Sequence, residues 1–383
     1  MSDPAAAENR AAAEPSAVTS KTDTVGRRHL RQWIAALAAA AVVALVVTLI
    51  VIANQPPGRF TTADARRAGV PVVVGDTLFR PDGTTTTLKL PDGDIITQLA
   101  VVPGGVVALV NHQDPDDAGV AVEVRLIPSG GGWEQLARPA ENAFAVTSDG
   151  RTVVAASGGA GIALESIDVT TRRTLQLIGG NWSVAALNGD WALLRSNSDD
   201  YVWRDSEIWN VRTGAVVPFA TSYGVTPLGV TPSGGVFRAV ESNPPAQPDA
   251  PAHACLDVVM PTGIGAAATV PTTPTGYCAV FDLADATVSP DGAWAVLIPR
   301  TVTAGHGVVA VRTADLHAGR WAPVDLNQAD GVSRPLFWDS PTTFIAPFAK
   351  DASDTGVERC SVDGHCRDFA LPANAVVGQP IDS

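Results

Sequence analysis

The chain of 383 residues is long enough for one large all-β domain, and it is acidic, with a formal net charge of −13 at pH 7. Its 35 Gly and 29 Pro amount to about a sixth of all residues, below the roughly 25–30% that is typical of wholly disordered chains. Residues 1–31 hold five of the 26 basic and four of the 39 acidic residues, which leaves a net charge of −14 on the remainder. Because such a domain repels nucleic acid and anionic lipid headgroups, we exclude both as partners.

The N-terminal segment predicts a membrane anchor. Residues 1–31 are rich in Ala, Ser and Thr and contain no aromatic residue, which predicts a disordered tail on the cytoplasmic side. Residues 32–53 contain the run Trp33–Ala53, which has no charge, Pro or Gly. A helix of this length spans about 30 Å, the thickness of the hydrocarbon core of a bilayer. We expect one transmembrane helix in the cell membrane; the alternative is a cleaved signal peptide, although the apolar part of such a signal usually has only about 7–15 residues.

Four cysteines indicate the compartment of the C-terminal part: Cys255, Cys278, Cys360 and Cys366. An even number of cysteines favours disulfide bonds in an oxidising compartment, so we place this part outside the cytoplasm. In RCSVDGHCR (359–367), a three-residue hairpin loop sets Cys360 opposite Cys366. Cys255 and Cys278 flank two apolar runs that predict a second hairpin. The alternatives are a zinc site and four free thiols in the cytoplasm.

Short β-rich runs separated by turns of Gly, Pro, Asp and Asn follow a linker at 54–70, and they predict an all-β domain over 71–380. A turn followed by an apolar strand recurs at VPGGVVALV (102–110), TSDGRTVVAA (147–156), LNGDWALLR (187–195), TPSGGVFRAV (231–240), SPDGAWAVLI (289–298) and WDSPTTFIAP (338–347). These strands start about 40–60 residues apart, close to the roughly 40–50-residue repeat of propeller blades. The sequence therefore predicts a β-propeller.

The number of blades follows from the strands within each repeat. The fifth repeat resolves into four strands, at 285–290, 293–299, 307–316 and 320–326. Six repeats occupy about 95–372, residues 70–90 add two or three strands, and the tail 374–380 adds one inner strand. Pairing of the tail with 70–90 would close a seventh blade and remove open sheet edges. We favour seven four-stranded blades over six, and a β-sandwich or two separate β domains is the alternative.

Two of the turns resemble a known repeat. SPDGAW (289–294) and TSDGRT (147–152) resemble the Asp-Gly repeats of TolB-like and WD-type propellers, and the layout as a whole resembles the membrane-anchored TolB-like propeller proteins of high-GC bacteria. The resemblance covers about 300 residues, although LNGDW (187–191) lacks the Pro-Asp-Gly turn and WDSPTTF (338–344) lacks the Gly. It implies protein binding and envelope scaffolding, while some members of the wider fold are enzymes.

Residues 242–276 lengthen one repeat and contain seven Pro. We expect this segment to be an insertion that Cys255 and Cys278 tie together. The apolar residues that we expect to be exposed on it and to dock a partner are Val258, Val259 and Ile264. A restrained loop of this kind loses little entropy on binding. The alternative is that both cysteines extend the outer strands of one blade and that 261–276 is an idle loop.

The sequence contains no G-x-S-x-G, no H-E-x-x-H and no phosphate-binding glycine loop, so we expect no catalytic residues, metal or cofactor. NHQDPDDAG (111–119) holds His112 among acidic residues, but the calcium-loop template fails because Ala118 and Arg125 occupy ligand positions. We therefore expect a non-enzymatic binding or scaffold protein of the cell envelope, whose partner is an envelope protein or a wall polymer. The alternatives are an extracytoplasmic hydrolase or lyase of propeller type and a transmembrane sensor.

Overall fold

In a computed structural model, all described residues belong to the unit Phe60–Ser383. The residues that it describes are 60–113, 120–137, 144–157, 163–196, 206–219, 225–243, 252–260, 277–281, 283–299, 308–318, 321–323, 336–349 and 355–379. The expected tail 1–31 and the run Trp33–Ala53 lie outside these ranges. Among the residues that are described, no helix is long and apolar enough to cross a membrane.

The described residues form sheets almost throughout. One sheet has eight strands, in the spatial order β3 (Thr85–Thr87), β2 (Thr77–Phe79), β1 (Val72–Val74), β28 (Val376–Gln379), β4 (Ile95–Val102), β5 (Gly105–Gln113), β6 (Val120–Pro128) and β7 (Glu134–Ala137). The described part also includes the helix α2 (Thr62–Ala68) and the 3-10 helix η2 (Thr313–Ala318).

Five further sheets have four strands each. The first two contain β8 (Phe144–Val146), β9 (Thr152–Ser157), β10 (Ala163–Asp168) and β11 (Thr174–Gly179), and then β12 (Trp182–Asn188), β13 (Trp191–Ser196), β14 (Ser206–Asn210) and β15 (Val216–Phe219). The next two contain β16 (Val225–Val230), β17 (Val236–Asn243), β18 (Ala252–Val259) and β19 (Tyr277–Phe281), and then β20 (Leu283–Val288), β21 (Trp294–Pro299), β22 (Val309–Arg312) and β23 (Trp321–Pro323). The last contains β24 (Phe337–Ser340), β25 (Thr343–Ala349), β26 (Thr355–Ser361) and β27 (Cys366–Leu371).

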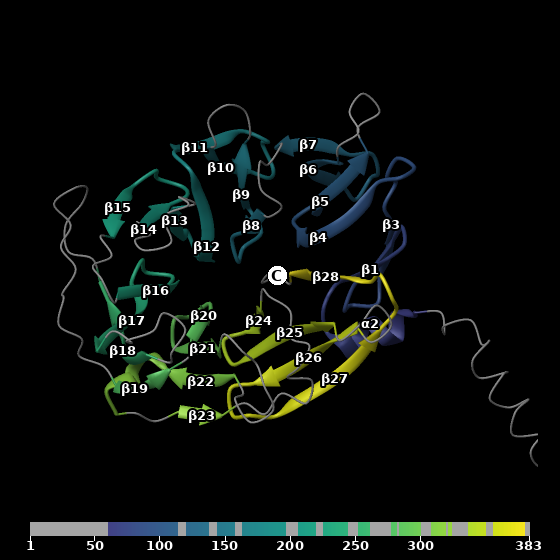
Figure 1. The fold of residues 1–383 in the computed structure, drawn as a ribbon. Coiled ribbons are helices and arrows are strands. Elements are labelled where there is room, and N and C mark those ends of the chain that lie inside the picture. The colour runs from purple at the N-terminus through teal and green to yellow at the C-terminus, as the bar shows by residue number, and fades with distance from the viewer. Residues whose placement is uncertain are drawn as a thin grey trace, which may run out of the picture. The chain divides into compact units, whose positions relative to one another are not determined.

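Each four-stranded sheet is an antiparallel blade of a propeller. The sheets follow one another around a common centre, with β8, β12, β16, β20 and β24 innermost (Figure 1). The predicted propeller is therefore confirmed, but there are five separate four-stranded blades, so the prediction of seven or six is wrong. The reason is that β28 pairs with both β1 and β4 and joins the remaining strands into one eight-stranded sheet.

The C-terminal strand β28 holds the first strands of the unit in place. It pairs antiparallel with β1, where Val377 lies opposite Val72, and parallel with β4, where Gly378 lies opposite Leu99. This pairing confirms the predicted contact between the tail and residues 70–90. A Cβ atom on Gly378 would lie 2.5 Å from Leu99 Cδ1 and 3.0 Å from Pro71 Cβ, so the close approach requires glycine.

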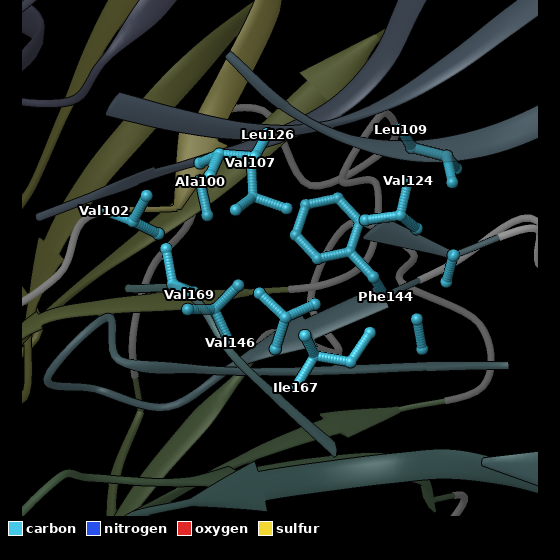
Figure 2. Packing of buried hydrophobic residues seen from close by; sticks show 13 residues of the cluster. Ala100, Val102, Val107, Leu109, Val124, Leu126, Phe144, Val146, Ile167 and Val169 are labelled. Carbon is cyan, nitrogen blue, oxygen red and sulfur yellow. The ribbon is translucent and has the colours of Figure 1, made fainter. Parts of the chain in front are cut away.

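Alternation of side chains along each strand builds the core. In β9, Val153 faces one cluster of buried apolar residues and Val154 faces the next, as the period of two in a strand requires. Figure 2 shows the first of these clusters, in which Val107 of β5 packs with Phe144 of β8. The described residues form seven such clusters. One of them, which contains Leu78 of β2, packs the two halves of the eight-stranded sheet against each other.

The Asp-Gly repeats form the tight turns between the two innermost strands of a blade. Between β20 and β21, Ser289 Oγ donates to Asp291 Oδ1 (2.6 Å), and the same oxygen accepts the backbone N–H of Ala293 (3.0 Å). Gly292 in this turn has a φ of 74°, which a residue with a Cβ atom rarely adopts. The turn at 147–152 repeats these contacts between β8 and β9. The short motif therefore encodes the hairpin locally.

One predicted disulfide bond is confirmed. Cys360 and Cys366 lie opposite each other on β26 and β27, are disulfide-bonded and have Cα atoms 4.1 Å apart. Gly364 in the connecting loop has the left-handed conformation that the loop requires, with a φ of 96°. The register of β18 and β19 also sets Cys255 opposite Cys278, and Cys255 is disulfide-bonded. A bond between these two cysteines remains our prediction.

Residues 60–70, which we expected to be the end of the linker 54–70, fold as part of the same unit. Thr61 caps α2, since its Oγ1 accepts the backbone N–H of Asp64 and its own N–H binds the Asp64 carboxylate. Ala68 and Val70 are buried in a cluster that also contains residues of the last blade, such as Ile345 of β25. The capping box thus starts a helix where the sequence composition alone predicted a linker.

The expected insertion 242–276 is not one continuous excursion. Its middle part forms β18, the third strand of a blade, and the described residues there end at Met260. Residues 244–251 and 261–276 lie outside the described residues. The prediction of a single insertion is therefore wrong, because the apolar run around Leu256 pairs with β17 and fills the core.

Candidate functional site

The three predicted docking residues fall on one strand and one undescribed segment. Val258 and Val259 lie in β18, while Ile264 lies outside the described residues. Val259 is 8% exposed within one core cluster, and Val258 packs partly buried against the next one. The expected exposure is therefore wrong for Val259, because alternate side chains of this central strand face two neighbouring blades. The exposed apolar residue at this end of the strand is Met260, at 52%.

Side chains connect the innermost strands near the centre of the ring. Gln98 of β4 donates its Nε2–H to the carbonyl oxygen of Phe144 (2.8 Å), and its Oε1 accepts the N–H of the same residue (3.3 Å). Gln379 of β28 donates to the carbonyl oxygen of Val146 (3.4 Å) on the same strand, β8. The strands β4 and β28 are thus both fixed to β8 by glutamine side chains.

Three inner turns meet at the end of the innermost strands. The buried Asn188, which ends β12, donates its Nδ2–H to the carbonyl oxygen of Ser289 (2.9 Å), which follows β20. Pro232, in the turn after β16, lies between these two: a Cβ atom on Gly189 would be 3.4 Å from its Cα, and one on Gly292 would be 3.1 Å from its Cδ. The three turns therefore pack against one another, and this packing joins three blades.

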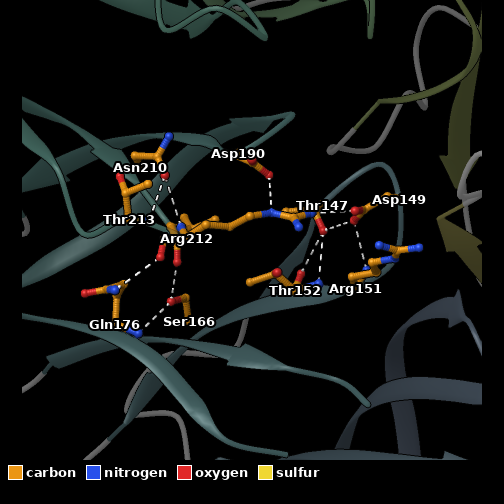
Figure 3. A network of polar contacts seen from close by, with 11 residues as sticks. Thr147, Asp149, Arg151, Thr152, Ser166, Gln176, Asp190, Asn210, Arg212 and Thr213 are labelled. Atoms are coloured by element: carbon orange, nitrogen blue, oxygen red, sulfur yellow. Dashed lines mark hydrogen bonds and ion pairs between the residues drawn. The ribbon is translucent and has the colours of Figure 1, made fainter. Parts of the chain in front are cut away.

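Arg212 joins two blades through its side chain (Figure 3). Its guanidinium pairs with Asp149 in the turn after β8 and with Asp190 in the turn after β12, the latter at 2.6 Å. Partial burial alone would lower the pKa of Arg212, but the two carboxylates outweigh this effect and raise the pKa. Burial alone would raise the pKa of Asp149, but hydrogen bonds from Thr147 Oγ1 and the Arg151 N–H, together with Arg212, lower it. The network is therefore held in its charged form.

Two further arginines are buried and paired. Arg238 of β17 donates two hydrogen bonds to the carboxylate of Asp257 on β18, at 2.7 and 3.1 Å, and both side chains are almost fully buried. Arg125 of β6 pairs with Glu123 (2.9 Å) and with Asp94, which precedes β4. Asp257 faces Arg238 from a neighbouring strand, Asp94 reaches Arg125 from the loop before β4, and Glu123 lies on the same strand as Arg125. The pairs with Asp257 and Asp94 therefore stabilise the packing between elements.

The carboxyl groups with a resolved shift favour the ionised form. These are Asp64, Asp82, Asp149, Asp168 and Asp363, and each has a lowered pKa. Except at Asp149, the largest cause is a hydrogen bond from a nearby Ser or Thr. A carboxylate that stays ionised suits ion pairing and turn formation better than proton donation. Within the described ranges, no group of three or more His, Cys, Asp or Glu is placed to hold a metal ion.

His112 ends up at the edge of the described structure. It lies near the end of β5, and the acidic residues 114–119 that follow it lie outside the described ranges. Its Nδ1 and the Oδ1 of Asn111 are buried and have no hydrogen-bond partner among the described residues. The described structure therefore brings no acidic side chain of that loop to the histidine.

The outermost strand β11 is a feature that sequence reasoning did not single out. It ends its sheet, so one of its edges has no neighbouring strand in that sheet. Its residues Leu175 and Leu177 are 38% and 62% exposed. The available sequence signal is TLQLIG (174–179), which has neither a charge nor a Pro, the residues that commonly protect sheet edges. Four other outermost strands contain such a residue, at Glu134, Pro218, Pro323 and Arg367, whereas β3 and β19 do not.

No protein-family model and no curated protein sequence matches this chain. Among solved structures, TolB from Acinetobacter baumannii is similar with a TM-score of 0.43 and 14% identity, over 85% of this chain and 88% of that chain. The β-propeller domain of the trilobed protease from Pyrococcus furiosus is similar with a TM-score of 0.48 and 10% identity, over 73% and 86%. An acylaminoacyl peptidase from Pyrococcus horikoshii is similar with a TM-score of 0.49 and 10% identity, over 73% and 46%. These similarities concern the propeller fold alone, and none of them indicates what this chain binds or catalyses.

Proposed function

We propose that this chain is a non-enzymatic binding or scaffold protein of the cell envelope. The run Trp33–Ala53 anchors it in the membrane, and the propeller lies outside the cytoplasm. The ligand is an envelope protein or a wall polymer, because an acidic domain repels nucleic acid.

The observation that carries the proposal is the pairing of charged side chains in the described propeller. The buried Arg238 binds Asp257 within a blade, and the partly exposed Arg212 binds carboxylates from two turns. A general acid or base must exchange a proton with a bound substrate, whereas these groups neutralise one another. The described propeller exposes apolar side chains, including Leu177 of β11 and Met260 after β18. Such side chains suit contact with a partner.

The disulfide bond between Cys360 and Cys366 supports the placement of the domain outside the cytoplasm. Disulfide bonds persist in oxidising compartments and are rare where thiol reductants are abundant. An extracytoplasmic propeller joined to a membrane helix is positioned to hold a second envelope component near the membrane. The membrane helix, the disulfide bond and the exposed apolar side chains are therefore all consistent with one role.

The test is quantitative co-purification from membranes. A tagged full-length chain is expressed, the membranes are solubilised in detergent, and bound proteins and polymers are quantified by mass spectrometry and sugar analysis. The matched control is a chain of residues 1–70, which keeps the apolar run and lacks every propeller strand. Both chains are compared at equal expression, so that material retained by the anchor alone is subtracted.

We expect the full-length chain to retain one main envelope component near stoichiometric amount, and the 1–70 control to lose it. Equal recovery on both chains would show that the propeller is not the binding part. Turnover of an envelope polymer by the purified full-length chain would contradict the non-enzymatic role and favour the hydrolase or lyase.

A further inference from the structure

Among the described residues, no strand pairs with the outer edge of β11, which we call its free edge. Gln176 donates its backbone N–H to Ser166 Oγ on the neighbouring strand β10 (3.1 Å). The Gln176 side chain also points toward the next blade, where its Nε2 donates to the carbonyl oxygen of Arg212 (3.2 Å). Since backbone groups alternate in direction along a regular strand, those of Leu177 point to the free edge, whereas Leu175 is the extra residue of a β-bulge opposite Ser166 and Ile167. An added strand would find hydrogen-bond donors and acceptors there.

The side chains at this edge are apolar and uncharged. Leu177 is 62% exposed and Leu175 is 38% exposed, while Gln176 between them is less exposed. The strand contains no Pro that would remove a donor and no charge that would repel a neighbouring strand. β11 therefore combines the two requirements for strand addition, which are unpaired backbone groups and apolar side chains at alternate positions.

The surroundings of β11 select the kind of partner. The strand follows two arginines; Arg172 pairs with Glu134 of β7, while Arg173 is exposed next to the start of the strand. A carboxylate at the end of an added strand would complement Arg173. In a second copy of this chain paired antiparallel about Leu177, the position opposite Arg173 is the neutral Asn181, so that copy offers no such charge.

The size of the edge also disfavours a second copy as the occupant. Two six-residue strands are only about 20 Å long, and contact along one strand edge falls short of the roughly 800 Å² per partner that stable complexes bury. Each copy also carries a net charge of −13, which opposes self-association. A short extended segment needs no larger interface, because its backbone hydrogen bonds and alternating pockets supply the affinity.

We propose that β11 binds an extended segment of another envelope protein by antiparallel strand addition. The segment has apolar side chains at alternate positions and a carboxylate at the end next to Arg173. This inference rests on the binding function proposed above and assigns that function to one edge of one blade.

The test uses the full-length chain in detergent micelles and a defined probe. The probe is a fluorescein-labelled peptide of alternating threonine and valine, six residues long, with a free C-terminal carboxylate; the same peptide with a C-terminal amide is compared. Fluorescence anisotropy is measured for the wild type, Leu177→Pro, Leu177→Val and Arg173→Gln. Leu177→Pro removes a backbone N–H that points to the free edge and is tolerated on an edge strand, while Leu177→Val keeps that N–H.

We expect saturable binding to the wild type with a Kd below about 1 mM. Leu177→Pro should weaken binding at least about tenfold, and Leu177→Val less than about threefold. Arg173→Gln should weaken binding of the carboxylate peptide and leave the amide peptide unchanged. If Leu177→Pro alters the circular dichroism spectrum, Leu177→Glu replaces it with the same expected loss.

Absence of saturable binding to the wild type, or equal binding to Leu177→Pro with an unchanged spectrum, overturns the proposal. The same variants are taken through the membrane co-purification. Loss of the natural partner from Leu177→Pro supports the β11 site. Retention of the natural partner on Leu177→Pro removes β11 as the site and leaves the binding function standing, so the two failures are distinguishable.

Discussion

Arg238 and Asp257 face each other on β17 and β18 and share two hydrogen bonds, at 2.7 and 3.1 Å, in an almost fully buried position. Arg238→Met removes the cation that donates both of these hydrogen bonds to the buried Asp257 carboxylate, so it should cost about 3–5 kcal/mol of unfolding free energy. Replacing both residues, Arg238→Met with Asp257→Leu, should recover most of that loss. The measurement is urea unfolding of a chain that lacks residues 1–54, analysed as a double-mutant cycle.

The control for this pair is the exposed ion pair between Arg67 and Asp64 in α2. Arg67→Ala should cost less than about 1 kcal/mol, because solvent screens an exposed pair. A double variant at Arg238 and Asp257 that is as unstable as the single Arg238→Met would contradict the account of a mutually compensating pair.

Gly378 tests the role of the C-terminal strand. Because a Cβ atom there would lie 2.5 Å from Leu99 Cδ1, Gly378→Ala should push β28 away from β4 and destabilise the domain by about 1–3 kcal/mol. Gly130→Ala is the matched control, since a Cβ atom at Gly130 meets nothing within 4 Å. Thermal unfolding of the two variants gives the comparison. Equal melting temperatures would show that β28 does not pack against β4 as described.

The pH dependence of stability tests the network around Arg212. Hydrogen bonds and the guanidinium lower the pKa of Asp149 in the folded state despite the opposing effect of burial. The unfolded value is about 3.9, so the ionised carboxylate stabilises the fold above that pH, and this contribution is lost as the pH falls through the folded pKa. Asp149→Asn should therefore lower the melting temperature at neutral pH and flatten its decline below about pH 4. If the melting temperature of Asp149→Asn falls below about pH 4 as steeply as that of the exposed control Asp92→Asn, Asp149 does not have this role.

The cysteines test both pairing and compartment. A native disulfide bond is worth about 2–4 kcal/mol, and in the chain-entropy model a longer closed loop contributes more. Cys255→Ser should therefore cost more than Cys360→Ser, and Cys278→Ser should match Cys255→Ser if these two cysteines are bonded. Unfolding of the three variants is combined with mass spectrometry of the unreduced protein taken from cells. Four free thiols in that protein would place the domain in the cytoplasm.

Local features of the fold could be predicted from the sequence because their causes are local. The turn at Ser289 and Asp291 is fixed by side-chain hydrogen bonds across two to five residues, so its motif reveals it. The hairpin of Cys360 and Cys366 is likewise closed by six residues of chain. The four-stranded repeat follows from the same turns and from the alternation of apolar residues.

Most long-range contacts could not be predicted, because they join residues that share no local motif. Asn188 reaches Ser289 across 101 residues, and Gln379 reaches Val146 across 233. The pairing of β28 with β1 was predicted, but its parallel pairing with β4, which joins eight strands into one sheet, was not, and this is why the predicted blade number was wrong. Val259 shows the same limit on a single strand, since the sequence does not say that both faces of β18 are covered by blades.

A membrane-impermeant, amine-reactive crosslinker applied to intact cells that express the full-length chain tests whether the propeller binds a partner outside the cytoplasm. After the run Trp33–Ala53 the chain has two lysines, Lys89 and Lys350, so any adduct reports on the propeller. We expect an adduct between the propeller and one envelope component without breaking the cells, and we expect no adduct in the Lys89→Arg, Lys350→Arg double variant. An adduct that forms only after the cells are broken would contradict an extracytoplasmic binding domain.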